Sequence, residues 1–150
     1  MSASENNEVL GRSLYAMWNE RAFDKIAALT AEYAEIVITA TGQRFKGPAG
    51  MREYCAGWAA AFPDGQVEVT NLVASEGGYA AEFIGRGTHT GPLSTPMGDI
   101  PPTQRRMEIA YCEVHEVRNG KLAGVRLYFD TATLMRQLGL LPEPSQAARG

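Results

Sequence analysis

The sequence has few of the residues that hold metal ions or cross-link small secreted domains. Its two cysteines, Cys55 and Cys112, stand far apart and belong to no CxxC motif, so we expect buried thiols rather than a disulfide framework or a structural zinc site. The two histidines, His89 and His115, lack the HxxxH spacing that places two imidazoles on one helical face. We therefore expect no metal site.

An excess of one charge and long apolar runs are also missing. Fourteen basic and seventeen acidic residues give a net charge of -3, with no block of lysine and arginine, so we expect no nucleic-acid partner. No apolar run approaches the roughly 20 residues that cross a bilayer, and the first eight residues do not resemble a signal peptide. We expect a cytoplasmic protein that does not bind membranes.

The length and the hydrophobic content fit one ordinary domain. The chain has 150 residues, of which 45% are hydrophobic, and a domain of this size buries roughly 70% of the surface that its unfolded chain exposes. We expect a single domain over residues 1–141. The polar, proline-bearing segment 142–150 is predicted to be a poorly ordered tail.

Hydrophobic periodicity divides the chain into a helical part and a part rich in strands. Apolar residues at helical spacing predict helices over 8–20, 22–35 and 47–62, with Trp18 in the first apolar stripe and Trp58 in the third. A β-branched run predicts a strand over 36–41. After Pro63 the period changes to two, which predicts strands over 66–75, 79–90, 105–118 and 121–129.

Turn and cap residues support this order of elements. Glu76-Gly-Gly78 and Asn119-Gly120 are hairpin signals, because both central residues of a type I′ turn need positive φ. Asp130 is placed to cap a last helix over 131–138, which Gly139 ends. Helices followed by consecutive antiparallel strands indicate an α+β fold, in which the helices cover one face of a bent sheet.

Several segments occur in the order found in one known family. The segments 87–91, 101–106, 119–121 and 130–139 together resemble the SnoaL-like polyketide cyclases of the nuclear transport factor 2 superfamily. The resemblance implies a cone-shaped curved antiparallel sheet with N-terminal helices packed on its concave face, a cystatin-like or nuclear transport factor 2-like fold. It also implies an apolar cavity between the helices and the sheet.

The cyclase mechanism itself does not transfer residue by residue. The resemblance places the cyclase aspartate at Leu127 and its supporting histidine at Glu113, and leucine cannot transfer a proton. Asp130 lies three residues farther on, where it serves either as a helix cap or as a catalytic acid. The epoxide hydrolases of the same superfamily need an Asp-Arg-Asp arrangement, and a second aspartate to match Arg126 and Asp130 is not evident.

Strand alternation predicts which residues face the cavity once one of them is fixed. If Glu113 points inward, Tyr111 and His115 share its face, and the next strand turns Val125, Leu127 and Phe129 inward. The row Ala110, Cys112 and Val114 then points outward. An exposed apolar row on a central strand needs a cover, so we expect a homodimer through the back of the sheet.

Glu113 is the predicted general base or ligand anchor, because an inward carboxylate must be protonated, paired or functional. We expect burial to raise its pKa toward neutrality and His115 to share its proton. The predicted ligand contacts are Tyr111, Val125, Leu127, Phe129, His89, Trp18 and Trp58. Tyr111 and His115 also fit plain core roles, and the direction of His89 cannot be read, because glycines around it allow bulges.

Two functions remain open at this stage, with a purely structural module as a third. The first is an enzyme that isomerises, cyclises or dehydrates a small hydrophobic oxygenated compound without a cofactor. The second is a non-catalytic binding protein for a hydrophobic metabolite. The proline-rich segment 91–104 cannot join the main sheet, and we expect it to border the pocket mouth or reach across the dimer.

Overall fold

Six strands form one curved sheet in the order β2-β1-β8-β7-β4-β3. The computed structural model describes residues 1–142. The strands are β1 (Thr30–Ile38), β2 (Gln43–Lys46), β3 (Gln66–Ser75), β4 (Gly78–Thr88), β7 (Arg106–Arg118) and β8 (Lys121–Phe129). All neighbours pair antiparallel except β1 and β8, which run parallel.

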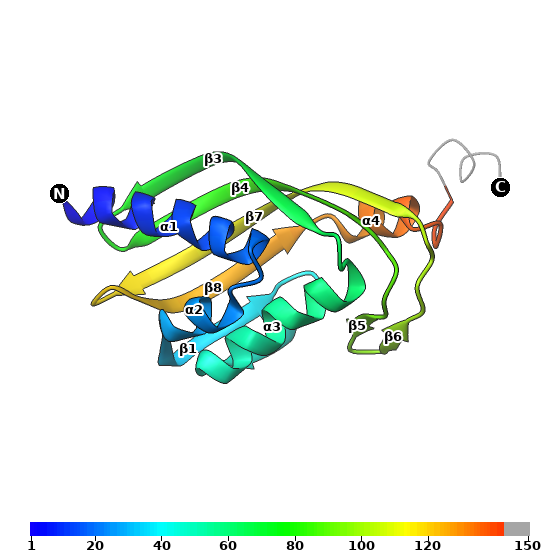
Figure 1. The fold of residues 1–150 in the computed structure, drawn as a ribbon, viewed down its shortest axis with the longest axis horizontal. Coiled ribbons are helices and arrows are strands. Elements are labelled where there is room, and N and C mark those ends of the chain that lie inside the picture. The colour runs from blue at the N-terminus through cyan, green and yellow to red at the C-terminus, as the bar shows by residue number, and fades with distance from the viewer. Residues whose placement is uncertain (143–150) are drawn as a thin grey trace.

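Helices cover one face of this sheet (Figure 1). They are α1 (Ala3–Asn19), α2 (Phe23–Ala28) and α3 (Gly47–Ala61), and a fourth, α4 (Thr131–Gln137), follows β8 and contacts β7. Ser2 closes the N-terminus of α1 with a capping box, and Asp130 caps α4 as predicted. The expected α+β architecture, with helices on a curved antiparallel sheet, is confirmed.

The central strand β7 alternates as the period-two pattern predicted. Its inward residues Ile109, Tyr111, Glu113, His115 and Val117 are buried, whereas the residues between them are exposed or half-buried. The following turn has positive φ at Asn119 (51°) and Gly120 (73°), as a type I′ hairpin requires. This register directs the polar groups of β7 into the space between the sheet and the helices.

The predicted helix over 22–35 is wrong in its second half. It ends as α2 at Ala28, and β1 starts at Thr30, because the backbone of this segment pairs with β8 and β2. The predicted strand over 36–41 is therefore shifted toward the N-terminus. The short strand β2, which follows the turn at Gly42, was not predicted.

The proline-rich segment stays outside the main sheet, as expected, but it contains a small hairpin of its own. Strands β5 (Leu93–Thr95) and β6 (Gly98–Ile100) form a separate two-stranded sheet. Pro92, Pro96 and Pro101 fall outside both strands, where a missing N–H costs no ladder bond. Figure 1 places this hairpin beyond the end of α3.

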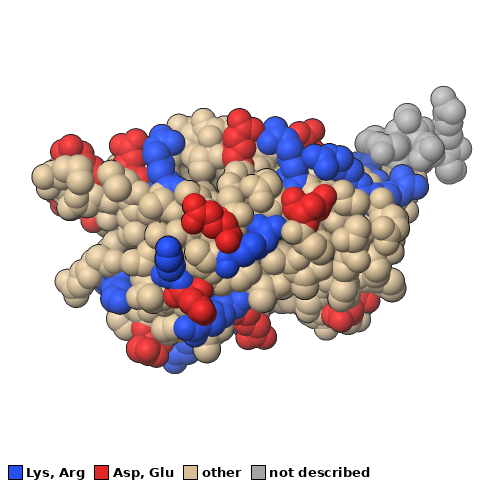
Figure 2. Space-filling model, viewed as in Figure 1, with Lys and Arg blue, Asp and Glu red and all other residues tan. Residues whose placement is uncertain are grey.

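The surface and the chain ends add little that bears on the site. On the face shown in Figure 2, basic and acidic side chains are interspersed over most of the surface, and basic side chains gather along the upper right edge. None of the helices in residues 1–142 is both long and apolar enough to cross a membrane. All but the first residue of the predicted tail 142–150 lies outside the described residues.

Candidate active site

Glu113 lies at the centre of the molecule, on the strand between β4 and β8. Its neighbours across the sheet are Ala81 and Leu127, and its side chain is buried beneath the helices, with only 5% of the residue exposed. A buried carboxylate is costly unless it accepts hydrogen bonds or pairs with a cation. The surroundings of Glu113 meet this requirement completely.

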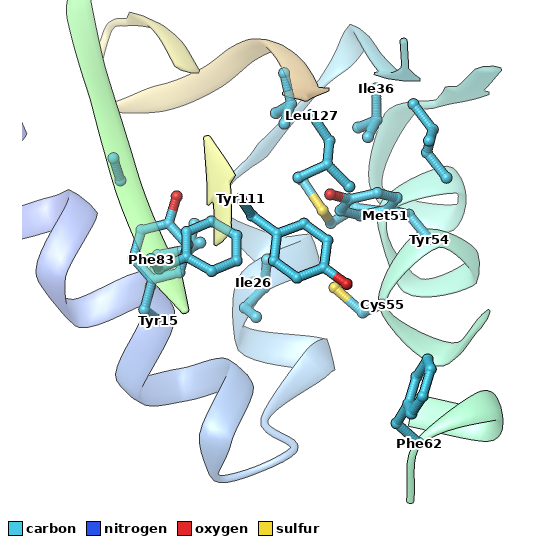
Figure 3. Close-up of a cluster of buried hydrophobic side chains, with 14 of the residues drawn as sticks. Tyr15, Ile26, Ile36, Met51, Tyr54, Cys55, Phe62, Phe83, Tyr111 and Leu127 are labelled. Atoms are coloured by element: carbon cyan, nitrogen blue, oxygen red, sulfur yellow. The ribbon is translucent and has the colours of Figure 1, made fainter. Parts of the chain in front are cut away.

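Three side chains donate hydrogen bonds to this carboxylate. Tyr15 on α1 donates its hydroxyl to Oε1 at 2.8 Å, and Tyr54 on α3 donates to Oε2 at 2.6 Å. The Nε2 atom of His115 lies 2.6 Å from Oε1, and it carries a proton because an ionised carboxylate only accepts. Figure 3 shows Tyr15 and Tyr54 on opposite sides of the buried cluster, with the rings of Phe83 and Tyr111 between them.

These donors decide the ionisation of Glu113. Burial raises the pKa of Glu113, but the attraction of His115 and the hydrogen bonds from His115, Tyr54 and Tyr15 outweigh burial and hold this pKa below its ordinary value of 4.5. The expectation of a pKa raised toward neutrality is therefore wrong. Glu113 is ionised at neutral pH, ready to accept a proton but a weaker base than expected.

His115 has a second ring nitrogen that the described part of the protein does not use. Its ring stacks on Tyr79 with centroids 4.5 Å apart, and its Nδ1 atom is buried without a hydrogen-bond partner among residues 1–142. Nε2 carries the proton that Glu113 accepts, and Nδ1 is the ring nitrogen that the described residues leave without a partner. Glu113 and His115 thus form a carboxylate–imidazole pair, which we call the acid/base pair.

The pair borders a small apolar cavity of about 70 Å³, which we call the inner cavity. Its wall contains both residues of the pair and the predicted contacts Trp18, Trp58, Tyr111 and Leu127, and the unpredicted Tyr15 and Tyr54. Cys55 is also in the wall, and burial raises the pKa of its thiol to about 12. Ligand pockets commonly have volumes of about 300–1,000 Å³, so the inner cavity accommodates only a small group.

A second, larger space of about 540 Å³ lies beside the first, and we call it the outer hollow. It is bounded by α3, α4, β2 and the β5–β6 hairpin, and Phe129 is in its wall. The proline-rich segment therefore borders the outer hollow, but none of its residues is in the described wall of the inner cavity that contains Glu113. Tyr54 and Trp58 belong to the walls of both spaces.

Three predicted site residues are in the wall of neither space. Val125 is buried in the core, 1% exposed, and is in the wall of neither space. The fully buried His89 accepts a hydrogen bond at Nδ1 from the backbone N–H of Thr103 and packs on Phe62. Asp130 is exposed and accepts from the backbone N–H groups that begin α4, which is the cap role.

Sequence reasoning missed Tyr15 and Tyr54, although both are central to the site. Each lies in a helical apolar stripe beside leucine, methionine or tryptophan, where an aromatic residue normally means core packing. A signal did exist, since a phenol in such a stripe needs a hydrogen-bond partner when it is buried. Within the described residues, no group of three or more His, Cys, Asp and Glu is placed to hold a metal ion.

Comparison with known proteins places this geometry in a family context. The profile of the SnoaL-like polyketide cyclase family matches residues 8–138, while no curated protein matches the chain. AclR from Streptomyces galilaeus, a proposed hydroxylase, superimposes with a TM-score of 0.78 at 23% identity, over 97% of this chain and 93% of its own. These values show a shared fold.

Two further structures have the same architecture. IdmH from Streptomyces antibioticus, a proposed polyketide cyclase, has a TM-score of 0.69 at 25% identity, over 93% of this chain and 99% of its own. A protein with a ketosteroid isomerase-like fold from Catenulispora acidiphila, in complex with trimethylamine, has a TM-score of 0.69 at 17% identity, over 84% and 88% of the two chains. The chain belongs to the SnoaL-like polyketide cyclase family and has its nuclear transport factor 2-like fold.

Proposed function

We propose that the protein is a cofactor-independent enzyme that moves a proton on a small hydrophobic oxygenated compound, as in isomerisation, cyclisation or dehydration. Family membership supports a cyclase or isomerase type of activity on a small molecule. The observation that carries the proposal is the ionised Glu113, paired with His115 and bordering a mostly apolar cavity. An apolar wall with a few convergent polar groups is typical of small-molecule sites.

Glu113 is the proton acceptor in this proposal, and Tyr15 and Tyr54 are positioning residues. The carboxylate takes a proton from a carbon of the substrate and returns it at another position, and His115 stabilises the charge through its Nε2–H. Because the pKa of Glu113 lies below 4.5, the carbon must be activated. A carbon between two carbonyl groups, or between a carbonyl group and a double bond, meets this need.

Leu127 explains why the reaction need not follow the known cyclase scheme. It stands opposite Glu113 in the register of β7 and β8 and lies in the cavity wall, at the position to which the resemblance assigns the cyclase aspartate. With leucine there, the ionisable groups of the described wall are on β7, on the helices and, at Arg86, on β4. The proposed base is therefore on a different strand from the base of the family's known reaction.

The test is proton transfer by the wild-type protein and by Glu113→Gln. A β,γ-unsaturated cyclohexenone, whose conjugated product absorbs in the ultraviolet, and a panel of cyclic diketones in deuterated buffer serve as probes. A positioned general base contributes about 10²–10⁴-fold in rate, and we expect Glu113→Gln to lose an effect of that size. Glu108→Gln, an exposed residue of the same strand, is the matched control and should keep the wild-type rate.

One observation favours a binding protein as the second candidate. All three donors to Glu113 come from the protein itself, so the carboxylate is satisfied before any ligand arrives. If the wild-type protein binds the ketones but exchanges their protons no faster than buffer, the enzyme proposal is wrong and the binding function takes its place.

A further inference from the structure

The outer hollow and the inner cavity share one partition, and this partition separates a ligand-sized space from the acid/base pair. The outer hollow, at about 540 Å³, lies within the volume range of ligand sites, whereas the inner cavity, at about 70 Å³, does not. A substrate of ordinary metabolite size therefore fits only if most of it lies in the outer hollow. Only one end of such a substrate can enter the inner cavity and reach Glu113.

The partition consists of aromatic side chains. Trp58 on α3 meets Tyr111 on the inner side and Phe129 on the outer side, each edge to face at 5.6 Å between ring centroids. Tyr111 and Phe129 also contact one another at 5.3 Å. These rings stand between the two spaces, and of the three only Trp58 is in both walls.

The two residues common to both walls differ in how firmly they are held. Tyr54 is anchored by its hydrogen bond to the Glu113 carboxylate. The half-buried Trp58 makes no side-chain hydrogen bond with residues 1–142 and is held by ring contacts alone. Turning its indole ring costs packing but breaks no hydrogen bond, so Trp58 is the part of the partition that can open.

The wall of the outer hollow also indicates the chemical class of its ligand. It is mostly apolar, with Ile38, Phe45, Leu93, Ile100, Leu134 and Met135 among its residues, and Glu53 is its one charged member within residues 1–142. With one carboxylate and no lysine or arginine in the described wall, an anion is disfavoured. The surface over the end of α3 and the hairpin, at the lower right of Figure 2, carries few charged side chains.

We infer that the outer hollow binds the body of a neutral, largely apolar molecule, and that Trp58 determines which part of that molecule reaches Glu113. This inference deepens the proposed function and rests on it for the reaction. The binding that it describes is measured without turnover, so the two can fail independently. Glu113→Gln should bind such a molecule as tightly as the wild-type protein, because the carboxylate is not in the outer wall.

The test uses fluorenone, a flat neutral ketone, and the indole N–H signals of the two tryptophans in a nitrogen–proton correlation NMR spectrum. Trp18→Phe and Trp58→Phe assign the two signals. We expect fluorenone to shift the Trp58 signal and leave the Trp18 signal in place, since Trp18 borders the inner cavity only. Fluorenecarboxylate, of similar shape but anionic, should bind several-fold more weakly.

A blocking variant locates the site independently. Thr131, at the start of α4, is exposed and in the wall of the outer hollow, whereas the exposed Ala132 beside it is not. Thr131→Phe should weaken fluorenone binding about tenfold or more, and Ala132→Phe should not change it. No binding, a shifted Trp18 signal with Trp58 unmoved, or equal affinity for the two phenylalanine variants would overturn the inference.

Discussion

The hydrogen bond from Tyr54 to Glu113 gives the sharpest test of how the buried carboxylate is stabilised. Oε1 has two donors, Tyr15 and His115, whereas Oε2 has Tyr54 as its one donor among the described residues. Tyr54→Phe keeps the ring and removes only the hydroxyl. It leaves a buried anionic oxygen without a partner, so it should cost more than Tyr15→Phe.

The magnitude follows from the charge of the acceptor. Hydrogen bonds to charged groups contribute about 1.5–3 kcal/mol, and neutral ones about 0.5–1.5 kcal/mol. We expect Tyr54→Phe to lower the free energy of unfolding by about 1.5–3 kcal/mol at neutral pH. Tyr111→Phe is the buried control, because its hydroxyl donates only to the sulfur of Met107, and it should cost about 1 kcal/mol or less.

Urea unfolding followed by circular dichroism measures these differences, at pH 7 and again at pH 3. Loss of the Tyr54 hydroxyl removes one of the contacts that lower the pKa of Glu113, so the variant carboxyl takes up a proton more readily than the wild-type one. The difference in unfolding free energy between the wild-type and Tyr54→Phe proteins should therefore be smaller at pH 3 than at pH 7. A Tyr54→Phe protein as stable as the wild type at pH 7, or a Tyr15→Phe protein less stable than Tyr54→Phe, would refute this reasoning.

Three further predictions concern pH, close packing and assembly. Because the pKa of Glu113 is lower in the folded protein than its ordinary 4.5, its stabilising effect is present above about pH 4.5 and is lost as the pH falls through the folded value. Glu113→Gln should therefore flatten the acid limb of a plot of unfolding free energy against pH. A methyl group at Gly85 would lie 2.6 Å from a ring carbon of Tyr111, so Gly85→Ala should cost about 1–3 kcal/mol. Gly57→Ala, where the added carbon meets nothing within 4 Å, should instead stabilise α3 by about 0.5–1 kcal/mol in the same urea titration. We also propose a homodimer through the outer face of the sheet, so light scattering should give a mass of about twice the 16.3 kDa of one chain. Val114→Asp should reduce this mass to that of a single chain.

The inward direction of Glu113 was predictable because it depends only on local geometry. A period-two strand with aromatic and aliphatic residues at alternate positions has one buried face, and Tyr111, Glu113 and His115 share that face. The direction of the Glu113 pKa shift was not predictable. It depends on hydroxyls supplied by two helices, and nothing near Glu113 in the sequence indicates that either phenol would reach it.

The errors in the predicted secondary structure have a similar origin. The segment 30–35 has residues that suit either a helix or a strand, and its pairing with β8, some 90 residues later, decides the outcome. The outer hollow could not be foreseen because it needs α3, α4 and the hairpin together. Patterns within a window of residues predict which face is buried, but not what a distant segment places against it.

The carboxylate of Glu113 also constrains the order in which the protein can fold. Its two phenol donors come from residues 98 and 59 positions earlier in the chain. A collapsed intermediate that covered Glu113 before both helices had docked would bury the ionised carboxylate without its hydrogen-bond donors. We therefore expect the helical layer to close over the sheet late in folding, after the folding transition state. Mutations of either tyrosine should then change the unfolding rate and leave the folding rate almost unaffected.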